Sequence, residues 1–324
     1  MPPELRTRTR DQSGIQGQGP QWVARLPREH IGFILGMLGV VMFSGTLPAM
    51  RIAVDGIDPT FVTAARAALA GIVAAACLIV LRRPYPKRSM WKRLATIAAC
   101  LIVGFPLLSA FAMKIIPAIH ASVIFGILPI ATATAAVAIA GERPSSSFWI
   151  ASAVGTCATI VFALRNGGFG ALALGDLLLL ASIVIVAIGY ALAGRLSIDL
   201  PGWEVICWAL VMMLPLSVPA AFILLPTNVT AIPMSSWGGF LYVSLISQLF
   251  AFFAWNTGLG LGGIARVGQI QLLQTFLSIW LASWVNREPI DSDVMFFSVI
   301  VVASVLVGTR MRVTRQTLPV QSST

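Results

Sequence analysis

Apolar runs of about 20 residues recur along almost the whole chain, and this recurrence constrains the fold more than any other feature. A helix needs about 20 residues to cross the roughly 30 Å hydrocarbon core, and it satisfies its own backbone hydrogen bonds there. The sequence therefore predicts an all-α integral membrane protein with ten transmembrane helices. The ten runs are residues 31–50, 61–81, 94–113, 115–140, 148–164, 177–193, 205–225, 240–259, 267–285 and 294–309.

Composition agrees with a membrane scaffold and excludes several classes of protein. Only 10% of the 324 residues are charged, whereas soluble proteins carry about 25%. Basic residues sit in short clusters between the apolar runs, with no basic face, so nucleic acid is not an expected partner. The four cysteines lie in different runs without metal-ligand spacing, so we expect reduced thiols, no metal and no cofactor. The expected partners are the lipid bilayer and a small-molecule solute.

The distribution of basic residues predicts the orientation. With the N-terminus inside, 17 of the 22 basic residues fall in cytoplasmic segments, four in outer segments, and Arg66 within a span. This asymmetry favours cytoplasmic termini and an even number of spans. Residues 1–30 are predicted to be a disordered cytoplasmic tail, without a cleaved signal peptide, and residues 311–324 a C-terminal cytoplasmic tail.

The two halves of the chain share one layout. Each has five spans, within residues 31–165 and 172–310, and the fourth span of each ends in a charged break, residues 141–144 and 286–289. Five is odd, so the second half crosses the membrane in the opposite sense, and such inverted repeats support alternating access. We expect the two glutamates of the breaks to cap loop ends. An offset of 146 pairs Glu142 with Glu288, Pro129 with Thr275, and His120 with Arg266.

Several motifs together resemble a known family. They are AARAA around Arg66, AMKIIPA at residues 112–118, the run 129–141 followed by Glu142, and GDL at 175–177. From about residue 31 to 310 the chain resembles the EamA-type transporters of the drug/metabolite transporter superfamily. This resemblance implies two inverted five-helix repeats, an inner-membrane location, and export of metabolites, amino acids or drugs. Thr275 departs from the pattern, because the family usually has proline there.

Polar side chains inside the spans are the candidate site residues, because each needs a partner or water. On an ideal helix, Gln271, Gln274, Thr275 and Ser278 lie within about 100° of one another. This polar stripe is predicted either to face substrate or to form helix–helix hydrogen bonds. Seven further residues are candidates for the same central volume: Ser44, Thr46, Ser109, Tyr190, Gln248, Trp255 and Asn256.

Two ionisable side chains inside the spans have two interpretations each. Arg66 would cost roughly 2.5–3.5 kcal/mol at a helix centre on insertion scales. It is either structural, bonded to backbone carbonyls or extended to the interface, or a counter-charge for a carboxylate-bearing substrate. His120 is of a type that titrates near neutral pH, so it either couples transport to protons or only satisfies a neighbour.

The sequence predicts a secondary transporter of small solutes, with no catalytic residues, and the family resemblance implies that the direction is export. Residues 258–263 imitate a nucleotide-binding loop but have no Walker ending, so we interpret them as a loop between spans and expect no use of ATP. The alternatives are a membrane enzyme acting on lipid-linked substrates and a non-transporting sensor or assembly factor. No motif indicates the substrate, the coupling ion or an oligomeric partner.

Overall fold

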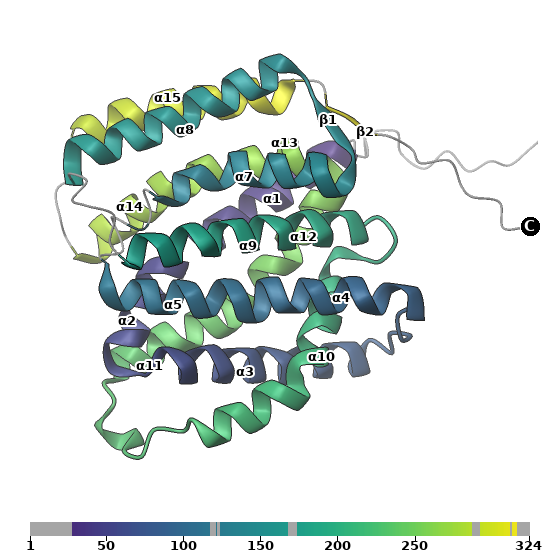
Figure 1. Cartoon of the computed structure of the whole chain (residues 1–324), viewed down its shortest axis with the longest axis vertical. Helices are drawn as coiled ribbons and strands as arrows, with labels where there is room; N and C mark the ends of the chain where they lie inside the picture. Colours follow the sequence, from purple (N-terminus) through teal and green to yellow (C-terminus); the bar gives the residue numbers. More distant parts are fainter. Residues whose placement is uncertain are drawn as a thin grey trace, which may run out of the picture.

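The computed structural model describes residues 28–116, 121, 124–167, 174–286, 292–311 and 313–315. Within this part the chain is helical, apart from two three-residue strands. Figure 1 shows the helices side by side in a bundle, with chain reversals at its two ends.

The helices of the first half are interrupted rather than continuous. They are α1 Arg28–Ser44, α2 Thr46–Gly56, α3 Pro59–Val80, α4 Trp91–Ala98, α5 Phe105–Ile115, α7 Leu128–Ala135 and α8 Ser146–Gly167. Short 3-10 turns, η1 Arg88–Met90 and η3 Phe125–Ile127, precede α4 and α7. Two π-helical segments, η2 Ala99–Gly104 and η4 Ala136–Ala140, follow them.

The second half repeats a π-helix and a 3-10 turn, whereas α9, its first helix, is continuous. Its helices are α9 Leu174–Leu196, α10 Gly202–Ile223, α11 Met234–Leu241, α12 Ala251–Gly262, α13 Ile264–Gly268, α14 Leu272–Asn286 and α15 Ser292–Arg310. The π-helix η6, Tyr242–Phe250, joins α11 to α12, and the 3-10 turn η7, Gln269–Gln271, joins α13 to α14. A third 3-10 turn, η5 Val229–Ala231, precedes α11. The ninth predicted span, residues 267–285, is thus irregular one turn before Thr275, although Thr275 is not a proline.

Six helical segments among the described residues are long and apolar enough to cross a membrane. They are Arg28–Gly56, Pro59–Val80, Arg88–Ile115, Leu174–Leu196, Gly202–Ile223 and Met234–Gly262. Phe125–Ala140 and Met295–Arg310 are shorter apolar helices. All ten runs of the sequence overlap helices, but a count of ten spans stays a prediction.

The bundle is built from helix pairs that are distant in the sequence. Residues of α1 pack mainly on α12, α3 on α10, α5 on α9, and α8 on α15. In Figure 1, α8 and α15 form one edge of the bundle, and α3 and α10 lie toward the opposite edge. The buried side chains between these pairs are mostly Ala, Val, Leu, Ile and Phe. One large apolar core runs through both halves, and a second, smaller cluster lies between α8, α14 and α15.

Glycines bring α1 and α12 into close contact. A Cβ on Gly32 would lie 2.5 Å from the backbone nitrogen of Gly262, and one on Gly258 would lie 2.8 Å from the carbonyl oxygen of Gly32. Small residues four apart allow such close approach between membrane helices. Our interpretation of residues 258–263 as a loop is therefore wrong: residues 258–262 are the last turns of α12, and only Gly263, with φ of 92°, leaves the helix.

The N-terminus of α3 is fixed by residues suited to it. Pro59 occupies the first helical position, and Asp58 caps the helix by accepting a 2.8 Å hydrogen bond from the backbone N–H of Thr60. The Thr60 hydroxyl, followed by backbone N–H groups, holds the pKa of the Asp58 carboxyl below its ordinary value. This cap therefore contributes stability above the ordinary pKa of an aspartate, and the contribution is lost as the pH falls through the lowered pKa.

Strand β1, Glu142–Pro144, pairs antiparallel with β2, Val313–Arg315. From β1 the buried Glu142 carboxylate accepts hydrogen bonds from the backbone N–H groups of Ile264 and Ala265, at 2.9 and 2.7 Å. The first N–H groups of a helix have no acceptor within the helix, and Glu142 supplies one at the start of α13. A negative charge there is also favoured by the helix dipole. Glu142 thus caps a helix end, but that of α13 in the second half and not the end of its own loop as expected. Glu288 lies outside the described residues.

Candidate functional site

The candidate site begins at a break in the first membrane-length helix. Helix α1 ends at Ser44, and α2 starts at Thr46 after Gly45. Pro48 explains the break, because it has no N–H to donate to the carbonyl of Ser44, four residues earlier, and its ring crowds that oxygen. The sequence thus leaves a backbone acceptor without a helical partner inside the bundle.

Side chains from distant helices bond the carbonyls around this break. The Ser278 hydroxyl donates to the oxygen of Ser44 at 2.6 Å, and the Gln274 amide donates to that of Phe43 at 3.5 Å. From η6, the Tyr242 hydroxyl donates to the oxygen of Met42 at 2.8 Å. The polar stripe on η7 and α14 is therefore engaged in helix–helix hydrogen bonds, one of its two predicted roles.

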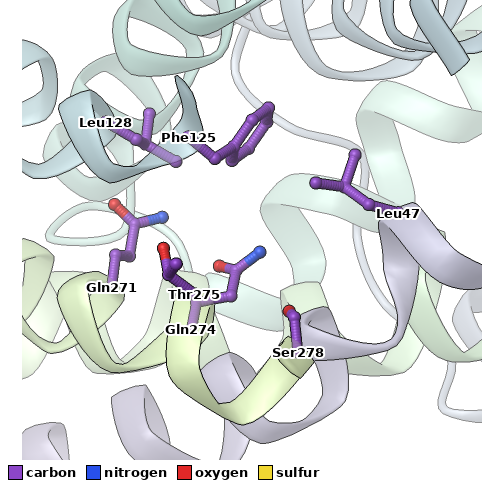
Figure 2. A pocket seen from close by; sticks show the side chains of 7 residues that line it. All are labelled: Leu47, Phe125, Leu128, Gln271, Gln274, Thr275 and Ser278. Carbon is purple, nitrogen blue, oxygen red and sulfur yellow. The ribbon is translucent and has the colours of Figure 1, made fainter. Parts of the chain in front are cut away.

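The same stripe lines a pocket. Gln271, Gln274, Thr275 and Ser278 form one wall, and Leu47, Phe125 and Leu128 form the other. Figure 2 shows the two amides pointing from the stripe toward the apolar residues. The pocket is narrow in this conformation: its cavity volume is about 10 Å³, enough for about one water molecule. Its lining, with amides and hydroxyls facing apolar side chains, suits a small amphipathic solute once the walls move apart.

Gln271 connects the pocket to an aromatic cluster. Its amide oxygen accepts from the Thr132 hydroxyl at 3.4 Å, and its amide nitrogen has no hydrogen-bond partner in the described part of the chain. The Tyr190 hydroxyl lies close to the same amide. Tyr190 packs in turn on Phe43 and Trp255, with ring centroids 6.4 and 5.4 Å apart. This cluster holds α1, α9 and α12 together beside the pocket.

The remaining candidates are not part of the pocket wall. Ser44 contributes its backbone oxygen, while its hydroxyl donates to the carbonyl of Val41 at 2.6 Å. Asn256 is fully buried, and neither amide atom has a hydrogen-bond partner among the described residues. Arg66 is buried on α3 and does not line the pocket. His120 lies outside the described residues.

Sequence reasoning missed the apolar wall and the cause of the helix break. Leu47, Phe125 and Leu128 look like any other apolar residues of a span, so nothing local marks them as pocket residues. Pro48 was a usable signal, because a proline inside an apolar run frees the carbonyl four residues before it. Tyr242 was a weaker signal: tyrosine is rare in this chain, with only three residues, so each is worth considering.

In the part of the chain that the structure describes, the polar groups lining the pocket are amides and hydroxyls, which can hydrogen-bond a solute, and none is a carboxylate, histidine or cysteine. Among the described residues there is also no group of three His, Cys, Asp or Glu side chains that could hold a metal ion.

Comparisons with known proteins agree with one another. The model of the EamA-like transporter family matches the chain twice, at residues 30–164 and 173–309. The uncharacterized transporter YdeK of Bacillus subtilis (strain 168) is 43% identical over 279 residues, which cover 86% of this chain and 97% of that protein. A protein of known crystal structure has a similar fold, with a TM-score of 0.70 at 20% identity, over 86% of this chain and 98% of its own.

Proposed function

The chain belongs to the EamA-like transporter family, and on this premise we propose that it is a secondary transporter whose pathway includes the pocket at the helix break. The observation that carries the proposal is the polar stripe of Gln271, Gln274, Thr275 and Ser278 facing that pocket. Broken helices and freed backbone groups inside a membrane protein are tolerated where they line a cavity. A small solute with hydrogen-bonding groups would bind there.

The proposed architecture is ten helices in two inverted five-helix repeats, residues 31–165 and 172–310. The packing pattern supports it, because exchanging the halves leaves the pattern unchanged. The contact of α1 with α12 becomes that of α9 with α5, and the pairs α3–α10 and α8–α15 each map onto themselves. Two related halves around one site provide two exposures of that site, as alternating access requires.

We propose an inner-membrane location, with both termini in the cytoplasm. The excess of basic residues in the segments assigned to that side supports this orientation. Export of metabolites, amino acids or drugs is the proposed direction and cargo class, and proton coupling through His120 is a further prediction. We propose no enzymatic role, since the matched family and the named relative are transporters and the described residues that line the pocket include no acid–base group.

The first test is counterflow with purified protein in liposomes. Amino acids, nucleosides, sugars and cationic drugs would be screened one class at a time, with and without a pH gradient. Exchange of one class would establish a carrier and its cargo. No exchange of any class, by protein that is folded and inserted, would contradict the proposal.

The second test asks whether the stripe lines the pathway. Replacing Gln271 and Gln274 by Leu should abolish counterflow, because both amides are removed from the pocket wall. The matched control is Gln269→Leu, which removes a buried amide of the same helix that bonds Ser152 and lies outside the pocket. Unchanged counterflow in the double variant would remove the stripe from the pathway.

A further inference from the structure

Among the described residues, Arg66 is a buried cation whose Nε and Nη1 have no hydrogen-bond partner. Its side chain is 1% exposed. Two ion pairs are found among the described residues, Arg83 with Glu204 and Arg266 with Glu29, and neither includes Arg66. Leaving a charge buried and unpaired is strongly destabilising, so a guanidinium in this position calls for an anion.

The two structural roles expected for Arg66 do not fit this environment. Hydrogen bonds to backbone carbonyls would satisfy Nε and Nη1, which have none. Extension to the membrane interface requires exposure, yet the side chain is fully enclosed. Arg66 is also the eighth residue of α3, so its Cα lies about 10 Å from the start of the helix at 1.5 Å per residue.

The packing of α3 on η6 gives the depth of Arg66 in the bundle. Phe61 of α3 stacks on Phe240, at 6.4 Å between ring centroids, and η6 then continues along α3. The two segments are therefore parallel, and Arg66, five residues beyond Phe61, lies at the depth of residues 244–248. That part of η6 is polar on its buried face, with Ser244, Ser247 and Gln248.

This polar face belongs to the neighbourhood of the pocket. The Ser247 hydroxyl is 2.9 Å from that of Thr46, whose neighbour Leu47 lines the pocket. Gln248 donates from Nε2 to the carbonyl of Leu101 in the π-helix η2, at 3.3 Å, and its Oε1 has no partner in the described residues. Two π-helices from the two halves thus meet here, and such segments are frequent at functional sites.

We propose that Arg66 is the anion-binding subsite of the pathway, and that it binds the carboxylate of the transported solute. A carboxylate matches the planar guanidinium in charge and geometry and can accept two parallel hydrogen bonds from it. The solute class is then small organic acids, amino acids included, whose remaining polar groups meet the amides and hydroxyls of the stripe. This inference rests on the proposed transport function for its cargo, but the binding of a carboxylate at Arg66 is testable without transport.

The binding test is the thermal unfolding midpoint of purified protein in detergent. Sodium propionate, benzoate and succinate would be compared with sodium chloride at equal ionic strength and with propionamide and benzamide. At least one carboxylate should raise the midpoint of the wild type, and its amide should not. A rise with chloride alone, or with the amides equally, would overturn the proposal.

Two variants assign the effect to Arg66. Arg66→Met should lose the response to carboxylate and, without carboxylate, melt no lower than the wild type, because an unpaired buried charge has been removed. Arg66→Lys keeps the charge but not the fork, so half-maximal stabilisation should need about tenfold more carboxylate. Arg83→Met is the control and should retain the full response. Two outcomes would make Arg66 structural. In the first, Arg66→Met still responds to carboxylate. In the second, the wild type does not respond to carboxylate and Arg66→Met melts below it.

Counterflow then separates this inference from the proposed function. The wild type should exchange carboxylate-bearing solutes, and Arg66→Gln should lose that exchange. Exchange of only neutral or cationic solutes by the wild type would leave the transporter standing and refute the carboxylate subsite. If no solute were exchanged, the function would fail, and the unfolding experiment would still decide whether Arg66 binds carboxylate.

Discussion

At the scale of the residue, the helix break at the site depends on Pro48, which has no backbone N–H. Pro48 cannot donate to the carbonyl of Ser44, and the hydroxyl of Ser278 donates to it instead. The polar stripe was visible in the sequence because spans contain few polar residues. Its bonding partners were not, since they are backbone oxygens on a helix more than 200 residues away. Whether the stripe also meets a solute stays a prediction.

Removing the Ser278 hydroxyl should expose this dependence. Ser278→Ala leaves a buried carbonyl unsatisfied, so it should destabilise the protein by about 1–3 kcal/mol, measured as a lower unfolding midpoint in detergent. The loss of stability caused by Ser278→Ala should be smaller in a Pro48→Ala background, because residue 48 then has an N–H that can donate to the carbonyl of Ser44. Ser235→Ala, at an exposed serine of α11, should change little. Equal losses with and without Pro48→Ala would refute our explanation of the break.

At the scale of the element, hydropathy predicted the positions of the helices well and their packing poorly. The predicted run 61–81 corresponds to α3, Pro59–Val80. The agreement is close because a proline suited to a helix start precedes the apolar residues and charged residues follow them. The glycine run 258–262 was misread because glycine favours loops in water. Within a membrane, close contact between backbones outweighs its low helix propensity. Only the partner glycines of α1 reveal that role.

Paired glycine substitutions test this packing. Gly32→Ala should destabilise the protein by roughly 1–3 kcal/mol, since its Cβ would meet the backbone of α12 at 2.5 Å. Gly238→Ala has nothing within 4 Å of the new Cβ, so it should be neutral or stabilise α11 by up to about 1 kcal/mol. Unfolding midpoints of the two variants in detergent give the comparison. Equal midpoints would mean that α1 and α12 are not in the close contact described.

At the scale of the whole molecule, the orientation and the number of spans remain to be measured. Charge counting predicts cytoplasmic termini, but it treats every apolar run as a crossing. The run 115–140 is the crossing that decides on which side α8 begins, because the charged break at residues 141–144 follows it directly. If it did not cross, the segment after it would lie on the opposite side.

Cysteine labelling resolves both questions in one set of variants. In a background without Cys77, Cys100, Cys157 and Cys207, a membrane-impermeant maleimide on intact cells should label Ser235→Cys. It should label Ser89→Cys and Ser146→Cys only after permeabilisation. Ser89 reports the orientation, because it precedes the run 115–140. Ser146, exposed at the start of α8, reports whether that run crosses, and Ser235 changes sides together with it. Outside labelling of Ser146→Cys alone would remove that crossing and with it the inverted repeat, because a first half with fewer spans could not mirror the second.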